Sequence, residues 1–205
     1  MTDTDRDKWN DRYRDGAYLG RDHAAELVAE HAPDIAATQR AAAPSGSALA
    51  ALDLACGAGR NARYLAGLGY RVDAVDIAAE ALSRAAATPA EAPIRWIEHD
   101  HDLGLPRGLG DYDLILIIRY LDLSLVAGAA ERLRPGGYLL CEAHLVSDAA
   151  VIGPRNPEFR ARPDELRRAA AALDVVEYWE GVRNDPDGRA AALARLVAWR
   201  PYPRP

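Results

Sequence analysis

The chain has 205 residues and a formal net charge of −6, and 49% of its residues are hydrophobic although only 7% are aromatic. This length suits one domain with its own core, and the acidic balance disfavours a nucleic-acid ligand, which would need a basic surface. No apolar run reaches the roughly 20 residues of a membrane-spanning helix, and the start, MTDTDRDKWNDRYRD, is too polar for a signal peptide. We therefore expect a cytoplasmic protein that has neither membrane nor nucleic acid as a partner.

The beginning of the chain predicts helices. Trp9 and Tyr13 have the i,i+4 spacing of one helix face. From His23 to Ala37 apolar residues recur at helical spacing, in a pattern that Pro33 interrupts. The segment Ala41–Ala48, AAAPSGSA, then predicts a loop.

Apolar runs and helical stretches alternate after this loop, which is typical of βαβ units and a parallel sheet. Tyr112–Ile118 predicts a central strand, because most of its positions are apolar in succession. RPGG at Arg134–Gly137 predicts the end of a helix and a turn into the next strand. The expected strands are residues 49–55, 70–76, 94–99, 112–118 and 138–145, and the expected helices between the first three are residues 61–68 and 78–87.

The last part of the chain begins with a long connection, Val146–Pro163, which contains three prolines. A loop of this length in a compact domain is often a binding loop or a lid. A helix is expected over Asp164–Ala172, followed by strand-like runs at Val175–Trp179 and Leu193–Trp199, with DPDG between them.

The two cysteines, Cys56 and Cys141, are too few for a disulfide framework and lack the spacing of metal ligands. Both fall in segments expected near the centre of the sheet. We expect buried thiols and no metal site.

The residues that follow the first two strands predict a cofactor site, because ligands of open parallel sheets bind at the carboxyl ends of the strands. In CGAGRN, Gly57 and Gly59 permit positive φ and a close approach of a ligand, and a helix begins near Asn61 with free N–H groups. Asp76 ends the second strand, 19 positions after Gly57, where its carboxylate can accept both hydroxyls of a ribose. Together these features predict an adenosine-containing cofactor.

Two cofactors fit this pattern, because GAGRNA also satisfies the G-x-G-x-x-G/A dinucleotide fingerprint. Asp53, in the pattern D-x-A-x-G-x-G, would repel a pyrophosphate but suits a cofactor with an ammonium and a sulfonium. A hydride-transfer Tyr-x-x-x-Lys pair is missing, since Lys8 is the only lysine. S-adenosylmethionine is therefore favoured, and an NAD(P)-dependent oxidoreductase is the alternative. A third hypothesis is a regulatory protein that binds the cofactor without transferring a group.

LDLACGAGRN, VDAVD, EHDHDLGLP and LRPGG occur in the order found in the class I S-adenosylmethionine-dependent methyltransferase family, which the chain resembles from about Leu49 to Leu145. The resemblance implies an α/β fold, a Rossmann-like three-layer sandwich with a seven-stranded, mostly parallel sheet whose last strand is antiparallel. It also implies a single domain over residues 1–205, with an N-terminal helical cap (1–40), a cofactor-binding core (49–145), and a substrate loop with a closing hairpin (146–205). WNDRY near the start is similar to the tellurite-resistance-type and thiopurine-type branch, which acts on small molecules.

The same resemblance assigns roles to individual residues. Ala55 stands where the family usually has glycine. The residues expected around the methionine part of S-adenosylmethionine are Asp53, Ala55, Gly57 and Gly59, with Asn61 at the start of the helix that follows. Asp76 would hold the ribose, Ile77 would pack on the adenine, and Asp100 with His101 would meet its amino edge. Ile118 and Arg119 would border the sulfonium and the acceptor.

The expected reaction is a direct displacement that yields S-adenosylhomocysteine, in which the enzyme aligns the two reactants and excludes water. If the acceptor is an alcohol or amine, His144 is the candidate base, whereas a soft anion needs none. Arg119, beside Tyr120, would bind an anionic acceptor or pair with Asp111 or Asp122.

Structural roles remain alternatives for several of these residues. Asp53 would then bond to a loop, Asp76 would cap the next helix, and His144 would form a satisfied pair with Glu142. The aromatic residues near the start would either anchor the first helix to the core or cover a sulfonium as a lid, namely Trp9, Tyr13 and Tyr18. The identity of the acceptor and the oligomeric state are not predicted.

Overall fold

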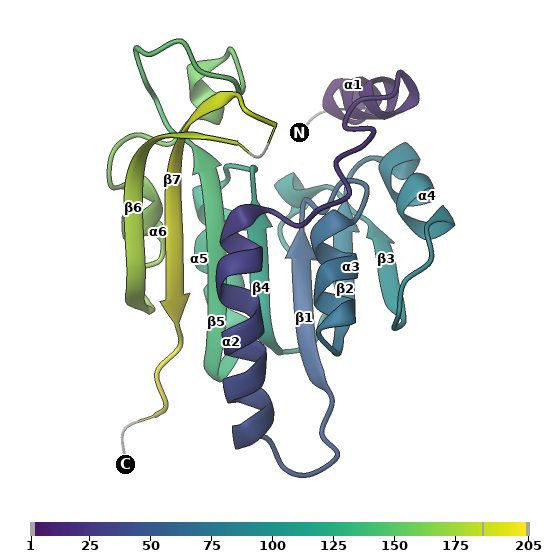
Figure 1. The fold of residues 1–205 in the computed structure, drawn as a ribbon, viewed down its shortest axis with the longest axis vertical. Helices are drawn as coiled ribbons and strands as arrows, with labels where there is room; N and C mark the ends of the chain where they lie inside the picture. Colours follow the sequence, from purple (N-terminus) through teal and green to yellow (C-terminus); the bar gives the residue numbers. More distant parts are fainter. Residues whose placement is uncertain (1–2, 186, 204–205) are drawn as a thin grey trace. The chain divides into compact units, whose positions relative to one another are not determined.

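The computed structural model describes residues 3–185 and 187–203 and divides into two compact units, Met1–Asp113 and Leu114–Pro205. The strand order is β3-β2-β1-β4-β5-β7-β6 in a seven-stranded sheet (Figure 1). The sheet is mostly parallel, and β7 runs antiparallel to both of its neighbours. The predicted Rossmann-like α/β fold is confirmed, whereas the division into one domain stays a prediction.

The first unit alternates helices and strands as expected. Its elements are α1 (Asp3–Arg14), α2 (Glu26–Ala42), β1 (Leu49–Leu54), α3 (Arg60–Gly67), β2 (Tyr70–Asp76), α4 (Ala79–Ala87), β3 (Ile94–Glu98) and the 3-10 helix η1 (His101–Leu103). Strand β1 is buried at every position and pairs in parallel with β2, which pairs in parallel with β3. Because these strands run in parallel, the residues that follow β1 and β2 lie at the same edge of the sheet.

Helix α2 continues through Pro33, so the prediction that this proline interrupts the helix was wrong. The helix runs unbroken in Figure 1. It buries an apolar stripe consisting of Leu27, Val28, Ala32, Ile35 and Ala36. Burial of this stripe outweighs the backbone hydrogen bond that proline cannot donate.

Helix α1 is anchored on the start of α4. The Tyr13 side chain is 7% exposed and packs with Ala78 and Ala81, and Trp9 lies against the same cluster. The Arg84 guanidinium donates hydrogen bonds to the carbonyls of Tyr13 and Ala17. The expected anchoring role is therefore confirmed for Tyr13.

The second unit contains α5 (Leu123–Glu131), β5 (Leu133–His144), the 3-10 helix η2 (Pro157–Phe159), α6 (Glu165–Ala169), β6 (Asp174–Asn184) and β7 (Ala190–Trp199), while β4 (Tyr112–Ile118) spans the boundary. Strand β5 begins at Leu133, so the predicted turn at Arg134–Gly137 was wrong. The reason is a distant pairing: the Gly136 N–H donates to the Arg200 carbonyl at 2.7 Å, and the Gly137 carbonyl accepts from the Arg200 N–H at 2.8 Å.

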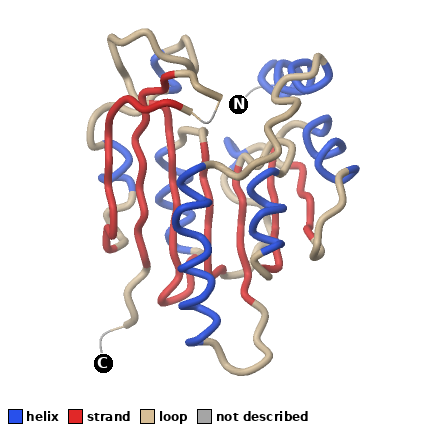
Figure 2. The backbone as a smooth tube through the Cα atoms, viewed as in Figure 1, coloured by secondary structure: helices blue, strands red, loops and turns tan. Residues whose placement is uncertain are grey.

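The connection after β5 is held by backbone hydrogen bonds, although Figure 2 draws most of it as loop. The Val146 N–H donates to the Ala161 carbonyl at 2.9 Å. The Arg160 guanidinium donates to the carbonyls of Leu145, Ile152 and Pro154 at 3.0, 3.4 and 2.8 Å. A single side chain thus binds three points of this loop together.

The structure also bears on the cysteines, on membrane-spanning helices and on metal ligands. Cys56 and Cys141 are free and buried, as expected. Within residues 3–185 and 187–203, the helices are too short or too polar to cross a bilayer. The same residues bring together no group of three or more His, Cys, Asp or Glu side chains that could hold a metal ion.

Candidate functional site

The turn after β1 has an unusual backbone. Ala55, Gly57 and Gly59 all have positive φ, at 56°, 55° and 78°. The turn is tied to β2, because the Cys56 N–H donates to the Val75 carbonyl at 3.0 Å and the Gly57 N–H donates to Asp76 Oδ2 at 2.8 Å. Helix α3 begins directly after Gly59, so its first N–H groups face the same turn.

Close neighbours explain the two glycines. A Cβ atom at Gly57 would overlap the hydroxyl of Tyr13, and one at Gly59 would lie 2.7 Å from Trp96 Cζ3 and overlap the same ring. Positive φ and crowding therefore both require glycine at these positions. Ala55 has positive φ as well, and holding an L-residue in this backbone conformation costs about 1 kcal/mol of free energy.

Asp76 joins the turn to the next helix. It is 8% exposed, and its Oδ1 accepts from the Ala78 N–H at 2.9 Å while Oδ2 accepts from Gly57. Burial raises the pKa of Asp76, and the backbone N–H donors of Ala78 and Gly57 counteract this rise. Each oxygen has a second lone pair. The alternative expectation that Asp76 caps the next helix was wrong, because the N-cap of α4 is Ala78 and no side chain caps it. The remaining lone pairs of Asp76 can accept hydrogen bonds from ribose hydroxyls.

Asp53 is a buried carboxylate without a hydrogen bond. Its side chain is 1% exposed, and neither oxygen makes a hydrogen bond of normal geometry within the described residues, although the Ala62 N–H lies nearby. Burial raises the pKa of Asp53 to about 7, and Arg60 lowers it only in part. Because buried charges are normally paired, this carboxylate fits a cationic ligand group, such as the ammonium of S-adenosylmethionine.

The expected adenine residues lie on the segments that follow β2 and β3. Ile77 is 4% exposed. Asp100 is 9% exposed and starts η1, since its Oδ1 accepts from the Asp102 N–H at 3.0 Å, and His101 is 3% exposed. Asn61 differs from the other expected cofactor residues, because its Oδ1 accepts from the Ala25 N–H at 2.8 Å and so binds the start of α2.

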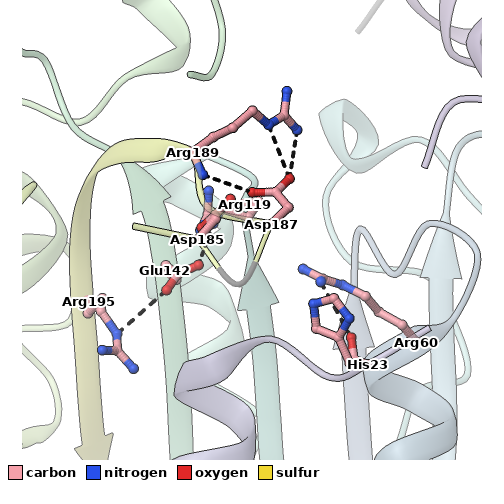
Figure 3. A network of polar contacts seen from close by, with 8 residues as sticks. All are labelled: His23, Arg60, Arg119, Glu142, Asp185, Asp187, Arg189 and Arg195. Atoms are coloured by element: carbon pink, nitrogen blue, oxygen red, sulfur yellow. Dashed lines mark hydrogen bonds and ion pairs between the residues drawn. The ribbon is translucent and has the colours of Figure 1, made fainter. Parts of the chain in front are cut away.

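In the second unit, Arg119 follows β4 with a φ of 61° and contacts two carboxylates. Its Nε donates to Glu142 and its Nη2 donates to Asp185 (Figure 3). Glu142 Oε2 also lies 3.5 Å from Nε of Arg195. Burial alone would lower the pKa of Arg119, but the carboxylates of Glu142 and Asp185 more than offset this and raise it. We call these four residues the charge cluster.

The sequence-based pairing of Arg119 was wrong. Arg119 pairs with Glu142 and Asp185 and not with Asp111 or Asp122, and Asp122 instead caps α5 by accepting the N–H groups of Ser124 and Leu125 at 2.9 Å each. The Glu142 carboxylate contacts two arginines, Arg119 and Arg195.

His144 ends β5 and is 9% exposed. Its ring lies against Gly153 of the connection, so that a Cβ atom there would lie 2.5 Å from Nδ1 and 2.7 Å from Cε1. Ile118 is buried at the end of β4, and Tyr120 is half-buried. The connection therefore fixes the surroundings of the predicted base.

Four of these residues were missed at the sequence level as parts of the site, namely Tyr13 as a neighbour of Gly57, Trp96, Asp185 and Arg195. A signal existed for Arg195, because it is a charged residue inside an apolar strand run, Leu193–Trp199. Asp185 gave only a turn signal, as part of DPDG.

Comparisons with known proteins identify the family and the fold of this chain. The family model described as "Methyltransferase domain" matches residues 51–137. The ubiquinone biosynthesis O-methyltransferase of Burkholderia orbicola is 30% identical over 169 residues, which cover 70% of this chain and 72% of that protein. Hemagglutinin 1 of Eikenella corrodens is 30% identical over 154 residues, 69% of this chain, and the chain spans about half the length of that relative (51%).

A solved structure, that of TehB from Haemophilus influenzae, has a TM-score of 0.64 and 23% identity, over 95% of this chain and 66% of that one. It supports the fold. The family model and the O-methyltransferase relative support S-adenosylmethionine as the cofactor, and neither supports the nicotinamide alternative. The chain therefore belongs to the class I S-adenosylmethionine-dependent methyltransferase family.

Proposed function

We propose that the protein transfers the methyl group of S-adenosylmethionine to a small-molecule acceptor by direct displacement and releases S-adenosylhomocysteine. The observation that carries this proposal is the pair of carboxylates beside the glycine turn. Asp53 is buried without a hydrogen bond, and Asp76 binds the turn itself while keeping lone pairs available. The first suits an ammonium and the second suits a ribose.

The turn would bind the cofactor through its own backbone. Gly57 and Gly59 allow a ligand to approach the main chain closely, and the start of α3 offers N–H groups to the methionine carboxylate. Ala55 would share this contact, Ile77 would pack on the adenine, and Asp100 and His101 would meet its amino edge. Asn61 would act indirectly, by linking α3 to α2.

On the acceptor side, His144 would take the proton of an alcohol or amine acceptor. An imidazole titrates near neutral pH, and the Gly153 contact restricts how the ring can turn. Ile118, Arg119 and Tyr120 would border the acceptor. The net charge of −6 supports a small-molecule acceptor over a nucleic acid.

Calorimetric titration with S-adenosylmethionine, S-adenosylhomocysteine and NADH tests the cofactor assignment. We expect the first two to bind and the Asp76→Ala variant to weaken both by about 100-fold, because the substitution removes the contact to Gly57 and the ribose acceptor. Asp73→Ala is the matched control: Asp73 lies on the same strand but bonds to Arg95 and Tyr112. Binding of NADH alone would overturn the proposal.

The role of His144 is tested with thiophenol and phenol as acceptor probes. His144→Ala should lower the methylation rate of phenol by 100-fold or more and change that of thiophenol little, because phenol must give up its proton to attack the methyl carbon near neutral pH, whereas thiophenol is already largely ionised. An unchanged rate with phenol would rule out His144 as the base. Binding of S-adenosylmethionine without turnover of any acceptor would instead support a regulatory protein.

A further inference from the structure

The charge cluster is balanced within itself. Arg119 and Arg195 carry two positive charges, and Glu142 and Asp185 carry two negative ones. The side chains of Glu142, Asp185 and Arg195 are only 3%, 7% and 6% exposed, whereas that of Arg119 is 21% exposed. Arg119 is therefore the member of the cluster that a ligand can reach most easily.

Arg119 is also held firmly. Its backbone has positive φ, its N–H donates to the Glu142 carbonyl at 2.6 Å, and its side chain donates through Nε and Nη2. Such a conformation costs free energy and persists only when several contacts impose it. Among the contacts of the described residues, Nη1 is the nitrogen of this guanidinium that has no protein partner.

Asp185 comes from the hairpin between β6 and β7 and not from a strand. The turn fixes it, since its N–H donates to the Arg189 carbonyl and its carbonyl accepts from the Gly188 N–H, both at 2.8 Å. A second carboxylate on this hairpin, Asp187, pairs instead with Arg189, and these side chains are 32% and 59% exposed. One hairpin thus supplies one carboxylate to the cluster and one to a surface pair.

We propose that Asp185 is a positioning residue that neutralises Arg119, so that the acceptor presents an uncharged oxygen, such as an amide, ketone or phenol oxygen, to Nη1. This inference rests on the proposed function. A carboxylate or phosphate at the same place would meet a guanidinium whose charge Glu142 and Asp185 already offset, so an anion gains little there while it loses its hydration. A neutral oxygen accepts an N–H of Nη1 at a smaller cost in hydration.

The test compares benzamide and benzoate, a neutral and an anionic probe of the same shape, bound to protein saturated with S-adenosylhomocysteine. We expect the wild-type protein to bind benzamide at least tenfold more tightly than benzoate. Asp185→Asn should raise the affinity for benzoate by about tenfold and change that for benzamide little, because one negative charge is removed beside Arg119. Asp185→Glu should restore the wild-type preference, which mere loss of packing would not predict.

Asp187→Asn is the matched control, since it removes the same charge from the same hairpin without a contact to Arg119. It should leave both affinities unchanged. Tighter binding of benzoate by the wild-type protein, or an equal gain in Asp185→Asn and Asp187→Asn, would overturn the inference. A failure of the cofactor assignment on which this inference rests is recognised separately, because the wild-type protein would then not bind S-adenosylhomocysteine in the first step.

Discussion

The turn after β1 in the first unit and the charge cluster in the second unit differ in how their buried charges are paired. At the turn, Asp53 is buried, and neither of its oxygens has a hydrogen-bond partner among the residues that the structure describes. In the cluster, every carboxylate has an arginine beside it. If the turn faces the constant cofactor and the cluster faces a more variable acceptor, as proposed, then the ligand completes the charge balance at the turn and the protein completes it in the cluster.

The largest effect that would sharpen this comparison is the pH dependence of cofactor affinity. Burial raises the pKa of Asp53 to about 7, so below pH 7 its carboxyl group is mostly protonated in the cofactor-free protein. Pairing with an ammonium needs the charged form. The affinity for S-adenosylmethionine should therefore fall by about tenfold per pH unit below 7. Calorimetry from pH 5 to 8 measures this slope, and Asp53→Asn should flatten it.

The same carboxylate affects stability with the opposite sign to a paired one. Its folded-state pKa lies above the unfolded value, so the folded protein binds more protons between about pH 4 and 7. The Asp53 contribution to the free energy of unfolding of the cofactor-free protein thus decreases as pH rises through this window. Asp53→Asn should make that protein more stable at pH 8, and a loss of stability there would contradict the description of Asp53 as unsatisfied.

The next largest effect is expected from Gly57→Ala. This variant tests whether the turn needs the space beside Gly57 or only the backbone conformation of a glycine. Gly57→Ala forces a Cβ atom into the Tyr13 hydroxyl, and overpacking costs about 1–3 kcal/mol. We expect the affinity for S-adenosylmethionine to fall by roughly 10- to 100-fold. Gly46→Ala is the control, because Gly46 also has positive φ but nothing within 4 Å. Equal losses in both variants would show that Tyr13 is irrelevant to the turn.

In the second unit, Gly153→Ala tests whether the connection after β5 orients His144. The new Cβ atom would lie 2.5 Å from Nδ1, so the ring must rotate or the loop must shift. We expect a fall in kcat of about tenfold with a neutral acceptor and an unchanged affinity for S-adenosylmethionine. Gly108→Ala, at positive φ with nothing within 4 Å of the new Cβ atom, controls for backbone strain. A change in cofactor affinity alone would count against the assignment.

The smallest effect concerns Ala55. Its φ of 56° is strained for an L-residue, and Ala55→Gly relieves this while making the unfolded chain more flexible. The two terms oppose each other, so we expect a gain of up to about 1 kcal/mol in the free energy of unfolding, measured by urea titration. A loss of stability would indicate that the methyl group of Ala55 makes contacts that outweigh the strain.

The turn could be predicted from the sequence because its chemistry is local. Gly57, Gly59 and Asp76 lie within one strand–helix–strand segment, and their spacing alone fixes the end of the sheet at which they meet. The charge cluster could not be predicted in this way. Glu142 and Asp185 lie 23 and 66 positions after Arg119, and only the hairpin between β6 and β7 brings the second one back.

The errors in the fold have a similar origin. RPGG has the composition of a turn, yet the Arg200 backbone pairs with Gly136 and Gly137 and makes this segment part of β5. Pro33 is a helix breaker by type, but the apolar stripe of α2 continues on both sides of it. In each case a contact formed far along the chain, or a whole buried face, outweighed the preference of individual residues.

The position of β7 has a consequence for synthesis on the ribosome. This strand follows β6 in the sequence, yet it lies between β5 and β6 and is buried at nearly every position. Until it has left the exit tunnel, the nascent chain exposes one edge of β5 and the apolar residues beside it. The second unit therefore completes its sheet only after β7 has been synthesised, and chains that stop before Ala190 would be prone to aggregate.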